Sequence, residues 1–154
     1  SYFKVFNDFL EVKPGQEVHF ELGRALVGQS ASLISRVLYV KNGLKRNFLI
    51  LDAGMTELIR PMLYQAYHQI KNLTREEVRK SGSPEDEKSL ITKYDVVGPI
   101  CESTDCFRKD VELPESFRGD LIAIRSAGAY GEVMVSNYNL RDRVQSVYSD
   151  VVDQ

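Results

Sequence analysis

The chain has little cysteine and little histidine. Its two cysteines, Cys101 and Cys106, are too few for a disulfide framework. Together with the scattered His19 and His68 they also fail to give a zinc-ligand spacing. This composition excludes a disulfide-stapled secreted module, predicts no bound metal, and favours a reducing, cytoplasmic setting.

Long apolar runs and an excess of charge of one sign are also missing. No run approaches the length needed to cross a bilayer, and charged residues interrupt residues 1–8, which therefore do not resemble a signal-peptide core. The 20 Lys and Arg residues balance 22 Asp and Glu and form no basic block, unlike the charge pattern of a nucleic-acid binder. We therefore expect a soluble protein with neither a membrane nor a nucleic acid as partner.

What the chain does have is enough apolar content for one core. At 154 residues and 43% apolar composition, it predicts a single globular unit. Short apolar segments separated by turn residues predict a mainly β fold, a small barrel or sandwich with short helices. The expected extended segments are 17–21, 32–40, 48–51, 67–73, 90–97, 110–113, 120–125, 133–138 and 144–148.

Three further local patterns complete the expected fold. Asn42-Gly43 predicts a hairpin turn between two strands. Residues 56–64 predict a short helix capped by Thr56, in which Pro61 is compatible with a first turn or a kink. Residues 74–89, charged and containing Gly, Ser and Pro, predict a mobile loop.

The segment Gly98–Asp105 is the most informative stretch of the chain. It sets Cys101 beside Glu102 on a turn after an apolar strand, a position suited to a proton donor. A free cysteine is more often buried and inert, but an adjacent carboxylate is rarely placed inside a core. The pair therefore predicts an exposed reactive site.

Several other residues have side chains suited to an anionic ligand. Gly23 permits close backbone approach to a phosphate, and Arg24 can clamp a carboxylate with two parallel hydrogen bonds. Arg60 and Tyr64 are four residues apart and would share one face of a helical turn. On local pattern alone, Arg24 could equally be a surface arginine, Arg60 could pack over a half-buried tyrosine, and Tyr130 could belong to the core.

Taken together, the motifs resemble the C-terminal portion of the diaminopimelate decarboxylase family, pyridoxal-phosphate enzymes of the alanine-racemase-like fold group. The resemblance spans essentially the whole chain and uses five blocks in the family's order: Glu21-Leu22-Gly23-Arg24, Asp52-Ala53-Gly54-Met55, Ile59-Arg60-Pro61 with Tyr64, Gly98-Pro99-Ile100-Cys101-Glu102-Ser103, and Ala127-Gly128-Ala129-Tyr130-Gly131. One block alone is weak, but the ordered set is specific.

The resemblance implies a two-part organisation. Residues 1–30 would be a remnant of the last unit of an α/β barrel, and residues 31–154 would form a β domain, a Greek-key barrel or sandwich. In the family, the barrel carries the lysine that binds pyridoxal phosphate, and that part would precede Ser1. No lysine of this chain lies in a block that matches the family's lysine motif. We therefore expect this chain alone to be inactive.

The resemblance also implies which residues border the cofactor. Glu21, Gly23 and Arg24 would lie at the cofactor phosphate, with Arg24 also reaching the substrate. Tyr130 would contact cofactor or substrate. Leu22 stands where the family usually has proline, which leaves the rigidity of this segment open but removes no polar contact.

For the reaction itself, the resemblance assigns four residues. Cys101 would be the proton donor, and Glu102 would recognise the distal ammonium of the substrate. Arg60 and Tyr64 would bind the distal end of the substrate. The cysteine loop of one subunit would complete the active site of the other, which implies a homodimer.

The resulting expectation is the C-terminal domain of a decarboxylase that converts meso-diaminopimelate to L-lysine and carbon dioxide. The alternatives are another decarboxylase of the group, acting on ornithine, arginine or carboxynorspermidine, and a non-catalytic binding module that shares only the fold.

Overall fold

The computed structural model describes residues 2–81 and 91–149, in which six strands dominate. The strands are β1 (Ser32–Asn42), β2 (Asn47–Leu51), β3 (Ile70–Asn72), β4 (Ile91–Val97), β5 (Cys106–Pro114) and β6 (Leu121–Arg125). The helices are α1 (Tyr2–Phe9), α2 (Gly23–Val27), α3 (Arg60–Tyr64) and α4 (Leu73–Ser81), with 3-10 turns η1 (Gly28–Ser30), η3 (Glu132–Met134) and η4 (Tyr138–Leu140).

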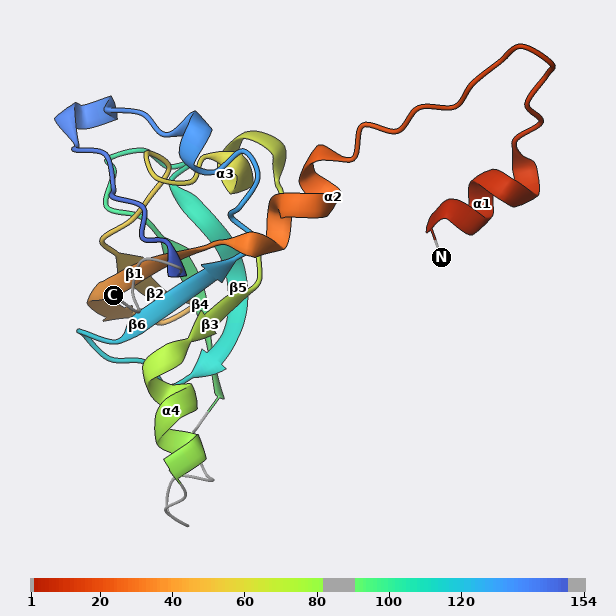
Figure 1. Ribbon diagram of the computed structural model, residues 1–154. Coiled ribbons are helices and arrows are strands. Elements are labelled where there is room, and N and C mark those ends of the chain that lie inside the picture. The colour runs from red at the N-terminus through yellow and green to blue at the C-terminus, as the bar shows by residue number, and fades with distance from the viewer. Residues whose placement is uncertain (1, 82–90, 150–154) are drawn as a thin grey trace.

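The strands form one sheet in the order β3-β6-β1-β2-β4-β5. All neighbours are antiparallel except β2 and β4. The edge strands β3 and β5 also contact each other, so the sheet curls into a nearly closed barrel (Figure 1). This confirms the expected mainly β architecture. Helices α2 and α3 lie toward one end of the barrel, and α4 projects from the other.

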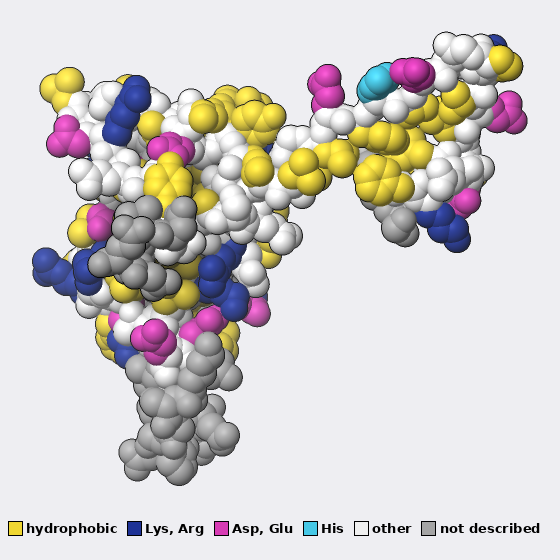
Figure 2. Space-filling model, in the orientation of Figure 1, with side chains coloured by type: hydrophobic (Ala, Val, Ile, Leu, Met, Phe, Trp, Pro, Cys, Tyr) yellow, Lys and Arg dark blue, Asp and Glu magenta, His cyan; other side chains and the backbone are white. Residues whose placement is uncertain are grey.

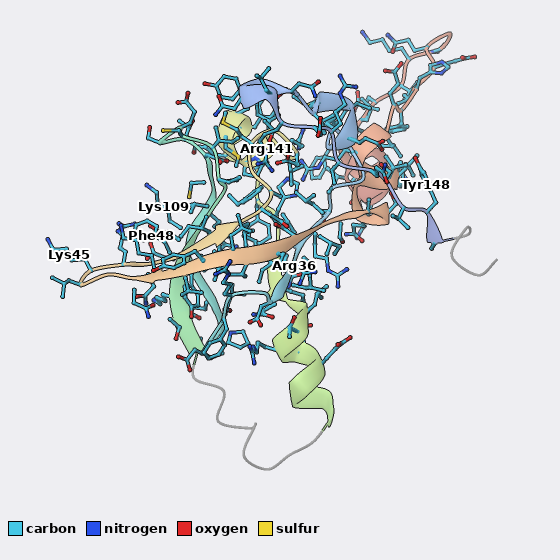
Figure 3. The ribbon with its side chains drawn as sticks, turned by 90° about the vertical axis from the view of Figure 1, so that its left-hand side faces the viewer. Arg36, Lys45, Phe48, Lys109, Arg141 and Tyr148 are labelled. Atoms are coloured by element: carbon cyan, nitrogen blue, oxygen red, sulfur yellow. The ribbon has the colours of Figure 1, made fainter. Side chains whose placement is uncertain are left out.

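The core of the barrel comes from the inward faces of its strands. Alternation along β1 buries Ser35 and Val37, whereas β6 is buried at three successive residues, 122–124. The core cluster comprises Val37, Leu49, Leu51, Ala53, Leu58, Ile70, Tyr94, Val96, Phe107, Val111, Leu113, Ile122 and Ile124. The predicted hairpin between β1 and β2 is confirmed, and the Gly43 amide donates to the Arg46 carbonyl at its tip. Lys45 marks this tip in Figure 3.

Three predicted strands are wrong. Residues 17–21, 133–138 and 144–148 pair with no strand among the residues described, and the second range contains η3 instead. Apolar β-forming residues make a strand only where a neighbouring strand completes their hydrogen bonds. The two edge positions of the sheet are occupied by β3 and β5. The three segments therefore have no strand edge to pair with in the described part of the chain.

The helices also differ from expectation. The segment predicted as a loop over 74–89 begins as α4, and the Asn72 side-chain oxygen accepts the Arg75 amide at its start, 3.0 Å away. Residues 82–89 lie outside the described part of the chain. The predicted helix over 56–64 is shortened to α3, with Pro61 in its first turn. Thr56 caps no helix because its buried hydroxyl donates to Glu57 instead.

A buried acidic group ties α4 to the barrel. Arg75 donates two hydrogen bonds to the Asp120 carboxylate, at 2.9 and 2.8 Å, and Asn72 and the Phe117 amide donate to the same group. Burial alone would raise the pKa of Asp120, but these hydrogen bonds outweigh it and hold the pKa below its usual value. The carboxylate is therefore a stabilising anchor.

Replacing Asp120 with alanine is expected to lower the free energy of unfolding by about 2 kcal/mol, because Arg75 and Asn72 lose their acceptor. The carboxylate's contribution is complete above the ordinary pKa of aspartate and is lost as pH falls through the lowered pKa of the folded state. Urea unfolding at neutral and acidic pH measures both effects. The matched control is Glu112→Ala, whose exposed pair with Lys93 contributes less than about 1 kcal/mol. Equal losses in the two variants would contradict the anchor.

The N-terminal arm, residues 2–22, projects from the barrel (Figure 1). Its two ends fold together where Phe20 meets Phe3 and Phe6 edge to face, with ring centroids 5.4 and 4.9 Å apart. Several of its apolar side chains are exposed, as Figure 2 shows: Phe3, Val5, Phe9, Leu10, Val12, Val18 and Phe20. Such a surface favours association. The expected domain division at residue 30 stays a prediction.

Candidate functional site

The loop that joins β4 to β5 presents Cys101 and Glu102 to solvent, as expected for a reactive pair. The Tyr138 hydroxyl donates a 2.5 Å hydrogen bond to the Glu102 carboxylate from a distant part of the chain. This bond raises the pKa of Tyr138, and negative charge on the nearby Cys101 would act in the same direction. Thiol, carboxylate and phenol therefore form one exposed group.

The Asp105 carboxylate fixes the position of this loop. It accepts the amide of Ile100 at 2.8 Å and the amide of Met55, from the loop after β2, at 2.7 Å. A side chain on Gly54 or Gly98 would collide with its oxygens. Burial raises the pKa of Asp105. The two glycines thus let one carboxylate join two loops.

The block at 52–55 is tied to the barrel by internal hydrogen bonds. Asp52 accepts the Ser35 hydroxyl and the Arg36 amide with one oxygen, at 2.5 and 2.8 Å. Arg141, labelled in Figure 3, donates to the Asp52 carbonyl at 2.6 Å and also pairs with Glu57. These contacts hold the loop after β2 in place.

A second group gathers around Arg60 at the start of α3. Its guanidinium carbon lies 5.3 Å from the ring centroid of Tyr64 and 5.6 Å from that of Tyr130. The predicted proximity of Arg60 and Tyr64 is therefore confirmed, and Tyr130 joins them. The Tyr130 hydroxyl also approaches Gly23, 3.6 Å from where a side-chain carbon would stand. An arginine held between two rings is suited to a carboxylate.

The predicted cofactor-side residues lie on or just before α2. Gly23 and Arg24 belong to this helix and not to a strand end as the sequence suggested, because residues 17–21 form no strand. Both are exposed, as is Glu21, which makes no hydrogen bond or ion pair with the other predicted site residues described. Burial, and in addition the positive charges of Arg60 and Arg24, lower the pKa of His68. Gly23 thus lies beside Tyr130, and the charge of Arg24 acts on His68.

Sequence reasoning missed two residues. Tyr138 is the first: its contact with Glu102 joins positions 36 residues apart, which no local pattern signals. His68 received no role, yet it lies in the arginine group. Among the described residues, no hydrogen bond, ion pair or ring contact joins the arginine group to the cysteine loop. Within that same portion, no three His, Cys, Asp or Glu side chains gather as a metal site, and no helix is long and apolar enough to cross a membrane.

Comparison with known proteins gives a consistent result. Residues 15–128 match the family model of the pyridoxal-dependent decarboxylase C-terminal sheet domain. Diaminopimelate decarboxylase of Bacteroides thetaiotaomicron is 56% identical over 150 residues, covering 97% of this chain and 36% of that protein. The Helicobacter pylori enzyme is 45% identical over 80% of this chain and 28% of its own length. The chain thus spans about a third of the length of these relatives.

Solved structures agree. The crystal structure of diaminopimelate decarboxylase from Helicobacter pylori complexed with L-lysine has a TM-score of 0.66 and 45% identity, covering 79% of this chain and 27% of that one. The M. jannaschii enzyme in complex with L-lysine has a TM-score of 0.67 and 36% identity, covering 79% and 25%. With the family model matched over most of the barrel, the chain belongs to the pyridoxal-dependent decarboxylases, as their C-terminal sheet domain.

Proposed function

We propose that this chain is the C-terminal domain of a diaminopimelate decarboxylase, an enzyme that converts meso-diaminopimelate to L-lysine and carbon dioxide. The observation that carries the proposal is the arginine held between two tyrosine rings, Arg60 between Tyr64 and Tyr130. It is a ready carboxylate site in a chain 56% identical to an enzyme of that name. Diaminopimelate has two carboxylates, so one remains to be held when the other departs.

The residues present fit pyridoxal phosphate. Arg24 supplies a cationic donor and Tyr130 a neutral one, and the absent side chain of Gly23 leaves room beside that hydroxyl. These three would hold the phosphate from the side of this domain. The chemistry that the cofactor supplies when bound is withdrawal of the electron pair left on the substrate when carbon dioxide departs.

Cys101 holds the proton that replaces carbon dioxide. Its thiol is exposed on a loop pinned by Asp105, so the sulfur can meet a substrate without first leaving a core. One proton passes from the sulfur to the carbon that lost its carboxylate, and solvent can reprotonate the exposed thiolate. Glu102, held by the Tyr138 hydroxyl, offers its carboxylate to the distal ammonium.

The two groups are proposed to meet across a homodimer. Within one chain, the described residues form no hydrogen bond, ion pair or ring contact between the cysteine loop and the arginine group. An isologous dimer would place the cysteine loop of each subunit opposite the arginine group of the other, giving two equivalent sites.

The test is a carbon dioxide release assay on the full-length protein that carries this chain, with diaminopimelate, ornithine, arginine and carboxynorspermidine as substrates. Diaminopimelate is expected to be preferred, and Glu102→Asp is expected to reduce that preference by about tenfold, because a carboxylate withdrawn by one methylene loses contact with the ammonium. Release from ornithine but not diaminopimelate would replace the proposed substrate, and no release from any would favour a binding module. An unchanged preference in the variant would remove Glu102 from specificity.

A further inference from the structure

His68 is a buried imidazole with one nitrogen in use. His68 lies four residues after the end of α3, and it is only 4% exposed. Its Nδ1 lies 2.9 Å from the Arg125 carbonyl, which can only accept, so Nδ1 carries the proton. Burial, opposed in part by this bond, lowers the pKa of His68, and the positive charges of Arg60 and Arg24 lower it further. The ring is therefore neutral, and its Nε2 carries a lone pair.

The lone pair on Nε2 of His68 accepts no hydrogen bond from the residues that the structure describes. Nε2 of His68 and Nε of Arg60 are the two side-chain nitrogens that are fully buried and have no hydrogen-bond partner in the described part of the chain. One is an acceptor and the other a donor, and the charge of Arg60 acts on the His68 ring. Buried polar groups are rarely left unpaired, since each costs free energy comparable to a lost hydrogen bond.

We propose that His68 is a positioning residue for Arg60: its Nε2, which no described protein group satisfies, accepts a hydrogen bond from one water that in turn accepts from the Arg60 guanidinium, while its Nδ1 is anchored on the Arg125 carbonyl. The anchor lies at the end of β6, which leads directly into the turn that carries Tyr130. One imidazole thus links the arginine to the same strand end that positions its stacking ring.

The consequence rests on the proposed function. The guanidinium has five N–H donors in a fixed plane, and only a correctly rotated plane offers a carboxylate two parallel bonds. The two tyrosine rings lie 5.3 and 5.6 Å from the guanidinium carbon, and contact with an aromatic face does not by itself specify how the guanidinium is rotated. A hydrogen bond at Nε fixes that rotation and leaves the outer nitrogens for the ligand.

The first test is nitrogen NMR on the 154-residue chain, which has only two histidines. Labelled His68 is expected to show a protonated Nδ1 and an unprotonated Nε2, and to titrate below the ordinary pKa of histidine. Arg60→Lys keeps the charge but removes Nε, and is expected to shift the His68 Nε2 resonance. The control Arg46→Lys, in the β1–β2 hairpin, is expected to leave it unchanged. A protonated Nε2, or a resonance indifferent to Arg60→Lys, would overturn the proposal whatever the protein's activity.

The second test separates positioning from packing in the full-length protein. His68→Asn can keep the bond to the Arg125 carbonyl but has no acceptor at the position of Nε2, whereas His68→Gln can place its amide oxygen there. We expect His68→Asn to raise KM for diaminopimelate about tenfold with a smaller change in kcat, and His68→Gln to recover most of that loss. A larger rise in KM for His68→Gln than for His68→Asn would show that only the hydrogen bond to the Arg125 carbonyl matters. That result would contradict the positioning role. A full-length protein that does not act on diaminopimelate would refute the proposed function and leave the NMR result standing.

Discussion

Replacing Cys101 with alanine in the full-length protein is expected to slow decarboxylation by about 10² to 10⁴-fold while leaving the binding of L-lysine and of cofactor within a few-fold of normal. The expectation follows from the position of the thiol. It is exposed on a pinned loop and contributes little to packing, so its removal takes away a proton source without disturbing the barrel. Steady-state kinetics, cofactor absorbance and a lysine binding titration measure the three quantities.

The chain supplies its own control for this experiment. Cys106, five residues on, is half-buried at the start of β5, and burial raises the pKa of its thiol. Cys106→Ala is expected to cost about 1 kcal/mol of stability and to leave turnover within a few-fold of normal. Equal loss of turnover and cofactor binding in Cys101→Ala would count against proton transfer. Equal loss of turnover in Cys101→Ala and Cys106→Ala would also count against proton transfer by Cys101.

Mixing two inactive variants is expected to restore about a quarter of the wild-type activity if the site is shared between subunits. The variants are Cys101→Ala, which disables the cysteine loop, and Arg60→Ala, which disables the arginine group. In an equal mixture, about half of the dimers are hybrids, and each hybrid has one site built from two intact halves. The measurement is activity after dissociation and reassociation of the two proteins.

The matched control changes two residues of the same loop. Hybrids of Cys101→Ala with Glu102→Gln contain no site with an intact loop, so their mixture is expected to recover nothing above the two parents. Recovery in this control, or its absence in the first mixture, would contradict the two-subunit arrangement. Because a failure to exchange subunits would also leave the first mixture inactive, hybrid dimers are first shown to form by native mass spectrometry.

The sequence was a good guide wherever a strand lies between neighbours. Segments 32–40 and 48–51 were located correctly because their apolar patterns are completed by pairing partners in the sheet. Segments 133–138 and 144–148 have similar composition but meet no free sheet edge. Whether such a segment becomes a strand depends on the distant residues beside it, which composition does not report.

The candidate site shows the same limit. The spacing of Arg60 and Tyr64 on one turn was visible locally, and the exposure of Cys101 followed from its neighbour Glu102. Tyr130, 70 residues beyond Arg60, meets its guanidinium only through tertiary packing, which no local pattern reports. The sequence does not predict a role for His68. That role depends on the three-dimensional structure, in which Nδ1 is hydrogen-bonded to the Arg125 carbonyl and Nε2 has no partner among the described residues.

The carboxylate of Asp105, enclosed by Gly54 and Gly98, has an evolutionary consequence. A methyl group at either glycine would need the space of its oxygens, while the amides of Met55 and Ile100 need those same oxygens as acceptors. Drift at any one of these three positions is therefore penalised unless the others change in concert. Homologues that have abandoned the acid should also have released Gly54, whereas Gly98 stays constrained because a Cβ there would lie 2.5 Å from the Gly54 Cα.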